Sequence, residues 1–127
     1  MNTHRLHPWN LRIEDAKRIQ VELASRVIRK DVLKEIRTVA GVDVSVRGDA
    51  ATAACVICSY PGLELLEYRA ETSALTMPYI PGLLSFREIP ALIPVLKKIR
   101  IKPDIFIADS QGIAHPRRFG LASHLGL

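Results

Sequence analysis

The stretch PYIPGLLSFRE, residues 78–88, separates two strand-like halves of the chain and decides how they connect. Its two prolines stiffen a loop that presents Tyr79, because proline fixes its own φ and favours extended geometry in the preceding residue. The loop leads into a helix, since Ser85 and Glu88 have the spacing of a capping box. The stretch therefore predicts a rigid loop, followed by a helix that crosses from one strand to the next.

An antiparallel meander is predicted before this stretch. Residues 38–46 alternate between a face of Ala and Val side chains and a face of small or polar side chains that includes Asp43. Residues 50–60 and 64–74 are further strand-like runs, and short turns join all three runs. Turns of this length connect antiparallel neighbours, and the valine face is expected to form the core.

A parallel strand is predicted after the stretch. Residues 103–109 form an apolar run that ends in Asp109. A helix between two strands implies a parallel crossover, although Pro90 and Pro94 are expected to make this helix bent or irregular. Ligands of open α/β sheets bind at the carboxyl ends of the strands, so Asp43 and Asp109 are expected to meet there. The predicted fold class is α/β, with three antiparallel strands, a parallel addition and flanking helices.

An amphipathic helix is predicted at residues 11–30, where apolar side chains recur every three or four positions. Asn10 is a candidate N-cap, and Arg29 and Lys30 suit the negative end of the helix dipole. We expect this helix to pack against the core and to have no catalytic role.

Composition fits one small domain of 127 residues with a net charge of +5. The positive excess suits a nucleic-acid partner, but many proteins that bind no nucleic acid are equally basic. No apolar run approaches the ~20 residues of a membrane span, and the N-terminus lacks the apolar region of a signal peptide. Cys55 and Cys58 fall on opposite faces of a predicted strand, which favours buried free thiols. These features predict a cytoplasmic protein without membrane contact.

Three carboxylates come from separate predicted elements: Asp43, Glu88 and Asp109. Oxygen ligands of this kind bind hard cations such as Mg²⁺ or Mn²⁺. Such an ion activates water and stabilises charge on a phosphoryl group. Two simpler interpretations stay open, because Glu88 could serve only the capping box and Asp43 could face water from an edge strand.

Basic residues surround the predicted parallel strand. His115 and the pair Arg117 and Arg118 follow Asp109, and they could transfer a proton or contact phosphates. On spacing, a loop histidine without a catalytic task is the simpler interpretation of His115. The basic residues between positions 97 and 102 could likewise contact phosphates or form a solvated helix end.

Three motifs resemble the endonuclease V family of deoxyinosine-directed DNA repair nucleases. They are VAGVDVS at residues 39–45, PYIPGLLSFRE at residues 78–88 and DSQGIAHPRRFGLASHLG at residues 109–126. The resemblance extends from about Arg12 to the end of the chain. It implies a ribonuclease-H-like fold and Mg²⁺-dependent cleavage of the second phosphodiester bond on the 3′ side of an inosine, with Mn²⁺ as a substitute.

The resemblance also implies roles for individual residues. The metal-binding carboxylates are Asp43, Glu88 and Asp109, with His115 near the active site. The wedge inserted beside the lesion is formed by Pro78, Tyr79, Ile80 and Pro81. The pocket for the extruded hypoxanthine is lined by Gly82, Leu84, Ser110 and Gly120. A stiff, flat side chain such as Tyr79 suits a wedge, because prying bases apart costs a few kcal/mol.

Two departures from the family pattern affect these expectations. Ser110 stands where family members usually carry glycine, and its side chain is expected to narrow the pocket or change the base preference. Family members also continue well past Leu127, so residues 1–127 are expected to be a single endonuclease V-like domain that is incomplete on its C-terminal side and lacks the last strand. The strand at 103–109 would then be an apolar edge that promotes self-association. Two alternative functions remain, a nucleic-acid-binding fragment deficient in catalysis and a nuclease for inosine in RNA.

Overall fold

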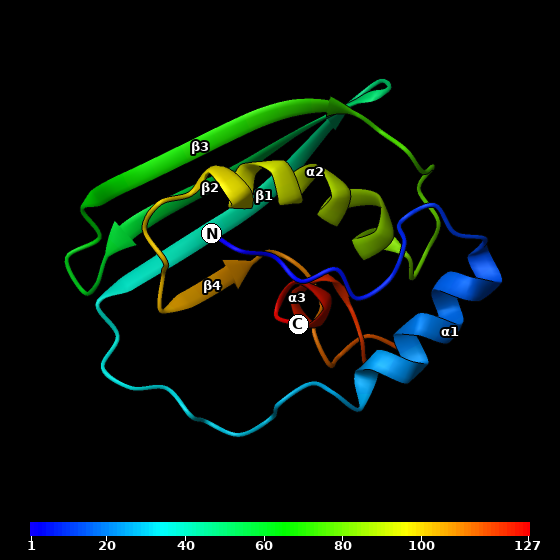
Figure 1. Cartoon of the computed structure of the whole chain (residues 1–127), viewed down its shortest axis with the longest axis horizontal. Helices are drawn as coiled ribbons and strands as arrows, with labels where there is room; N and C mark the ends of the chain where they lie inside the picture. The colour runs from blue at the N-terminus through cyan, green and yellow to red at the C-terminus, as the bar shows by residue number, and fades with distance from the viewer.

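The computed structural model describes residues 1–127 and contains one four-stranded sheet with three helices (Figure 1). The elements in chain order are α1 (Ile13–Ala24), β1 (Thr38–Arg47), β2 (Ala50–Ser59), β3 (Leu65–Ala74), α2 (Leu84–Lys98), β4 (Ile105–Ala108) and α3 (Leu121–Leu125). The strand order is β3-β2-β1-β4, with β4 parallel to β1 and the other two pairs antiparallel. The predicted α/β sheet of three antiparallel strands and one parallel addition is therefore confirmed.

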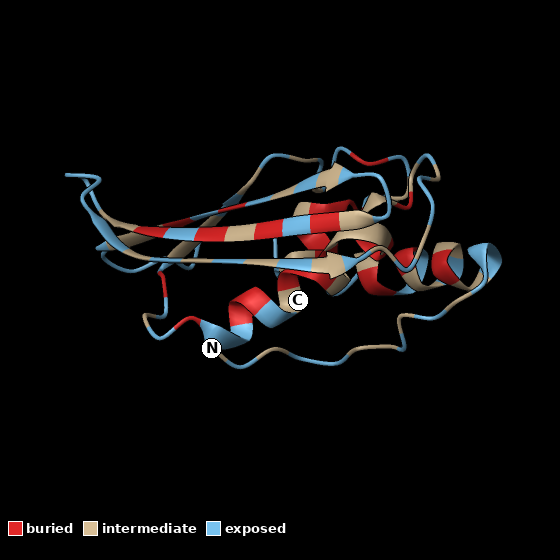
Figure 2. Cartoon of the chain, turned by 90° about the horizontal axis from the view of Figure 1, so that it is seen from above, coloured by how far each residue is buried: buried red, intermediate tan, exposed pale blue.

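Helix α2 covers one face of the sheet and closes the core. Its buried side chains Leu92 and Val95 pack against the alternating inward residues of the strands, among them Val42 and Ile57. Figure 2 shows this alternation of buried and exposed residues along the strands. The predicted inward face of residues 38–46 is confirmed, and Asp43 lies on the opposite, exposed face. Position 43 therefore carries an acid at no cost to the core.

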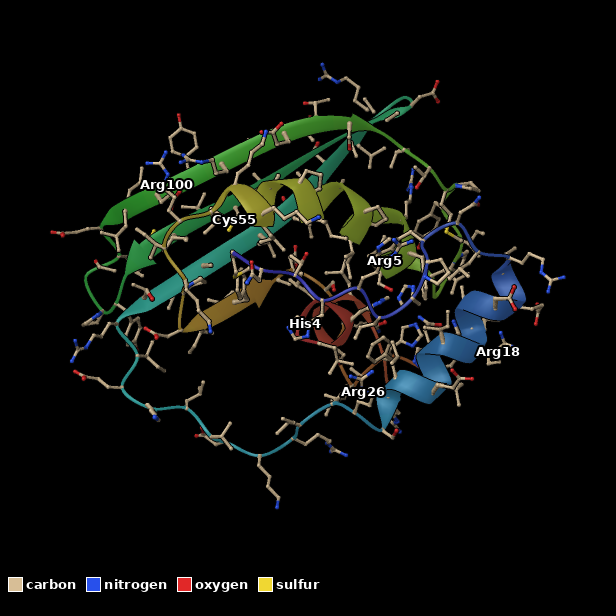
Figure 3. All side chains as sticks on the ribbon, viewed as in Figure 1. His4, Arg5, Arg18, Arg26, Cys55 and Arg100 are labelled. Carbon is tan, nitrogen blue, oxygen red and sulfur yellow. The ribbon has the colours of Figure 1, made fainter.

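The two cysteines are both free thiols, as predicted from their spacing. Cys55 is fully buried in the core between the sheet and α2 (Figure 3). Cys58, on the other face of β2, is only half-buried. None of the three helices combines the length and the apolar character that a membrane crossing requires.

Helix α2 differs from the prediction at its start and in its middle. It begins at Leu84, and no side chain caps it, so the predicted capping box of Ser85 and Glu88 is wrong. The reason is tertiary, because the Ser85 hydroxyl is buried and hydrogen-bonds to His124 instead. The helix also runs without interruption through Pro90, since packing of its buried face offsets the missing backbone hydrogen bonds.

Helix α1 is shorter than the predicted span of 11–30, because it ends at Ala24. Its N-cap is Arg12 without a side-chain cap, so the predicted cap by Asn10 is wrong. Beyond Ser25 the apolar pattern continues, but Val27 is only half-buried and Ile28 is 74% exposed. Tertiary contacts therefore set the length of this helix, and its amphipathic period does not.

A second, smaller core attaches α1 to the loop before α2. It consists of Ala16, Leu83 and Phe86, with Trp9 and Ile80 packed against them. The N-terminal segment that carries Trp9 runs alongside α2 and α3 before it enters α1 (Figure 1). This small core fixes the loop at residues 78–83 on both sides and so positions the side chains described next.

Candidate active site

Two of the predicted acids lie on neighbouring parallel strands. Val42 pairs with Ala108, so Asp43 and Asp109 follow paired positions on strands that lie roughly 4.8 Å apart. The register of β1 and β4 therefore places the backbone positions of Asp43 and Asp109 next to each other, as predicted. Both residues are exposed, and the Asp43 carboxylate accepts a hydrogen bond from the amide of Val44 at 2.9 Å.

The third acid, Glu88, is half-buried on α2. Burial raises the pKa of its carboxyl group, the neighbouring Arg87 guanidinium lowers that pKa, and the negative charge of Asp43 raises it again. Asp43 and Glu88 are therefore close enough for their charges to repel. A cation between them would relieve this repulsion and favour the ionised form of Glu88.

The three carboxylates are too far apart in this structure to coordinate one metal ion together. No group of three Asp, Glu, His or Cys side chains lies close enough together to hold a metal ion. Asp43 faces the exposed side of the sheet, whereas Glu88 belongs to the helix on the other side. No Lys, Arg or His side chain forms an ion pair with any of the three acids. The donor chemistry therefore fits a hard divalent cation, and convergence of the donors requires side-chain movement.

A cavity of about 280 Å³ lies beside Asp109, and it gathers the residues predicted to bind a base. The predicted residues that line it are Tyr79, Gly82, Leu84, Ser110, Gly120, Asp109 and His115. The other four lining residues, which no sequence motif indicated as part of a pocket, are Gln20, Ser85, Gln111 and Leu121. The structure thus brings the loop of residues 78–83, the start of α2 and the segment after β4 around one space.

The carbonyl oxygen of Gly82 is the centre of a hydrogen-bond cluster on the cavity wall. It accepts hydrogen bonds from Gln20 Nε2 at 2.8 Å, His115 Nε2 at 2.9 Å and Arg117 Nη2 at 3.1 Å. Gly82 has a φ of +83°, a left-handed conformation that favours glycine. The loop tip is therefore held by side chains from α1 and from the segment after β4.

His115 is placed by two hydrogen bonds that together define its tautomer. Its Nδ1 accepts from the backbone amide of Arg117 at 3.0 Å, so the proton of the neutral ring resides on Nε2, facing Gly82. With the ring buried and both nitrogens used, His115 shapes the cavity wall in this structure. No free ring nitrogen remains to transfer a proton.

The two arginines predicted as phosphate contacts are placed differently. The Arg117 guanidinium turns inward, and its Nε donates to Gln20 Oε1 at 2.6 Å. Arg118 is exposed, and the one hydrogen bond of its side chain goes to the carbonyl oxygen of Ile113 at 3.3 Å. Of this pair, Arg118 is therefore the residue that can reach an incoming phosphate.

Gly120 lies where the cavity wall is most tightly packed. A Cβ atom at this position would lie 2.1 Å from the carbonyl oxygen of Gln111, which is far inside van der Waals contact. Only glycine allows the segment after β4 to approach this closely. At Ser110, in contrast, the cavity has room for a side chain, and the Ser110 hydroxyl donates to the Gln111 carbonyl at 3.4 Å.

Tyr79 is presented at the mouth of the cavity with 61% of its surface exposed. The Arg87 guanidinium carbon lies 5.8 Å from the centre of its ring, a cation–π contact that orients the tyrosine. Arg87 Nε is buried and has no hydrogen-bond partner. The sequence analysis missed Arg87, although it lies within residues 78–88, and it missed the buried Gln20, which is a polar residue on an apolar helix face.

Comparison with known proteins gives a consistent result. A family model described as Endonuclease V matches residues 21–127. Endonuclease V of Roseiflexus sp. (strain RS-1) is 48% identical over 120 residues, which are 94% of this chain and 54% of that protein. The crystal structure of endonuclease V from Streptomyces avermitilis has a TM-score of 0.85 at 39% identity, covering 93% of this chain and 54% of that one.

A second similar structure contains a nucleic acid. It is Ciona intestinalis endonuclease V in complex with a 24mer DNA containing an inosine followed by a ribo-adenosine, with a TM-score of 0.83 at 33% identity. The match covers 90% of this chain and 52% of that chain. The present chain spans about half the length of the relatives that it matches.

Proposed function

The chain belongs to the endonuclease V family, and on this premise we propose that it recognises hypoxanthine in DNA and takes part in cleaving the second phosphodiester bond on its 3′ side. One observation carries the proposal, namely the cavity that joins the Tyr79 loop to Asp109. An extruded base would enter beside an acid of the candidate metal site.

The free thiols Cys55 and Cys58 further support a cytoplasmic location.

An oligonucleotide assay tests this function. A labelled DNA strand with one inosine is incubated with the protein and Mg²⁺, beside the same strand with adenosine in its place. The expected result is a single nick, two phosphodiester bonds to the 3′ side of the inosine, and an intact control strand. Equal cleavage of both strands, or a nick at another position, would contradict the proposal.

The proposal includes a divalent cation, Mg²⁺ or Mn²⁺, held by Asp43, Glu88 and Asp109. When bound, the ion supplies an activated water and stabilises charge on the phosphoryl group. Three residues of the chain have further roles in this proposal. Glu88 would be favoured in its ionised form beside a cation despite its burial, Asp109 lines the cavity proposed for the base, and Arg118 has an exposed guanidinium that would contact a phosphate.

Tyr79 is proposed to act as the wedge, because the loop of Pro78, Ile80 and Pro81 holds it rigidly and Arg87 orients its ring. Replacing Tyr79 with alanine is expected to weaken binding of inosine-containing DNA by about tenfold or more, since aromatic stacking on a base contributes roughly 1–3 kcal/mol. Fluorescence anisotropy of the labelled strand measures this loss. Tyr68→Ala is the matched control, because Tyr68 is an equally exposed tyrosine on the outer face of β3. A Tyr79→Ala variant that binds as tightly as the control would refute the wedge role.

A second function is favoured by one observation. Because the three acids do not converge, the chain could bind nucleic acid without cleaving it. Tight, metal-independent binding with no nicking would support this alternative. The ribo-adenosine in the Ciona complex also makes inosine in RNA a substrate to compare, because a 2′-hydroxyl distinguishes the two nucleic acids.

Self-association is proposed through β4. This strand has β1 on one side only, and Ile107 is 61% exposed. An unpaired apolar edge is a template for pairing with another chain. Size-exclusion chromatography with light scattering is expected to show dimers or larger species that shift toward the monomer in Ile107→Lys. A wild-type chain that is monomeric at high concentration would contradict this expectation.

A further inference from the structure

A continuous chain of hydrogen bonds runs from the N-terminal segment to the base cavity. His7 Nδ1 lies 2.8 Å from the carbonyl oxygen of Pro8, and His7 Nε2 lies 2.7 Å from His124 Nε2. His124 Nδ1 then lies 2.9 Å from Ser85 Oγ. Both histidines also line a second cavity of about 340 Å³, whereas Ser85 lines the base cavity. The chain of hydrogen bonds thus connects two separate spaces across the start of α2.

The direction of this chain of hydrogen bonds follows from its first member. The Pro8 carbonyl can only accept, so His7 Nδ1 carries a proton and Nε2 of the neutral ring does not. His124 must therefore donate from Nε2 and accept at Nδ1, and Ser85 must donate its hydroxyl proton to that nitrogen. In the neutral state every proton is assigned, and the last one is that of Ser85.

The surroundings of His124 keep it neutral. The ring is 5% exposed and packs among Trp9, Phe86 and Phe119, with centroid distances of 5.3, 5.1 and 4.9 Å. Burial, with a contribution from His7, lowers the pKa of His124 to about 3. Nδ1 of His124 is therefore available as an acceptor for the Ser85 hydroxyl.

A serine that donates its only proton to a histidine presents lone pairs in every other direction. Ser85, a buried residue that lines the base cavity, can therefore offer its hydroxyl oxygen only as an acceptor. Beside it, the amide N–H groups of Leu84 and Ser85 have no acceptor, because α2 begins there without a cap. Leu84 and Ser85, which both line the cavity, thus carry one hydroxyl acceptor and two amide donors without a partner.

We propose that Ser85 reads the lactam edge of the base, with His124 and His7 as positioning residues that fix its hydroxyl as an acceptor. Hypoxanthine carries a donor at N1 and an acceptor at O6, which complement Ser85 Oγ and the free amides. Adenine reverses this order, with an acceptor at N1 and a donor at N6. This inference rests on the proposed function, because it assigns a role within the same cavity.

Base discrimination tests the proposal. Anisotropy measures the affinity of the protein for single strands that differ only in inosine or adenosine. Ser85→Ala is expected to reduce the wild-type preference for inosine about tenfold, the effect of one lost hydrogen bond in a desolvated site. Ser123→Ala is the matched control, because it truncates another buried serine, next to His124, that does not line the base cavity. If Ser85→Ala preferred inosine as strongly as the wild type does, this inference would be wrong and the proposed function would stand. If the wild-type protein itself showed no preference for inosine, both the proposed function and this inference would be wrong.

Two further measurements separate proton ordering from simple packing. His124→Asn keeps an acceptor near the position of Nδ1 and is expected to retain more of the inosine preference than His124→Leu, with equal losses counting against a positioning role. In ¹⁵N NMR of the wild-type protein, His124 is expected to show a protonated Nε2 and an unprotonated Nδ1. The opposite tautomer would overturn the ordering, and this readout requires neither DNA nor a folded variant.

Discussion

Nicking of an inosine-containing strand is expected to fall by about 10³-fold when Asp43 or Asp109 is replaced by alanine, because each change removes charge stabilisation at the reacting phosphate. Neither carboxylate forms an ion pair and both side chains are exposed, so their loss is expected to disturb the core little, although Asp43→Ala also removes the hydrogen bond to the Val44 amide. Single-turnover nicking in Mg²⁺ measures the effect. The melting temperature is expected to stay close to that of the wild type.

The matched control is Asp49→Ala. Asp49 is an exposed acid in the turn between β1 and β2, away from β4 and the base cavity. This variant is expected to nick at the wild-type rate. If Asp43→Ala or Asp109→Ala nicked as fast as Asp49→Ala, the assignment of these acids to a metal site would fail.

Stability is expected to decrease steadily as the pH falls from 6.5, because the pKa of His124 is lowered from 6.5 to about 3 on folding. Between these values the unfolded chain binds a proton that the folded chain does not, so acid favours unfolding. The stabilisation is fully present above pH 6.5 and is lost by about 1.4 kcal/mol per pH unit below it. By pH 4.5 the loss is roughly 2–3 kcal/mol, a large share of the 5–15 kcal/mol typical of a domain.

Urea unfolding at pH 7.0, 6.0 and 5.0 measures this loss in the free energy of unfolding. Glu67 and Asp104, whose pKa values are lowered by backbone hydrogen bonds, act only at more acidic pH. Glu88, whose pKa is raised by burial, has the opposite effect on stability as the pH falls, so the comparison with a His124 variant isolates the contribution of His124. His124→Gln removes the titrating group, so its stability is expected to vary much less across the same range. A wild-type free energy that stays constant from pH 7.0 to 5.0 would contradict the buried neutral state of His124.

The sheet could be predicted from the sequence because its signals are local. Alternation at residues 38–46 gave the inward face of β1, and the strand–helix–strand order gave the parallel placement of β4. The errors lie where tertiary contacts override local pattern. The capping box at Ser85 matched in sequence, but His124, 39 residues away, takes the hydroxyl. The predicted end of α1 was wrong because the apolar side chains beyond Ser25 are not buried, as Ile28 shows.

The candidate site was predictable to the extent that its residues lie within recognisable motifs. Gly82 and Gly120, which the resemblance assigns to a base pocket, line one cavity together with Tyr79, which it assigns to the wedge. Gln20 and His7 could not be found in this way, because their roles depend on hydrogen bonds that span 62 and 117 positions of sequence. No local pattern records such a partner.

The carbonyl oxygen of Gly82 has a consequence for the order of events on DNA. Opening the loop would break hydrogen bonds from Gln20, His115 and Arg117 at once, so the receptor for the base is preformed. If the chain binds an extruded base, as proposed, the free-energy cost of extrusion falls on the DNA duplex and not on the protein. Capture is then expected to be faster for a weakly paired inosine than for a firmly paired one.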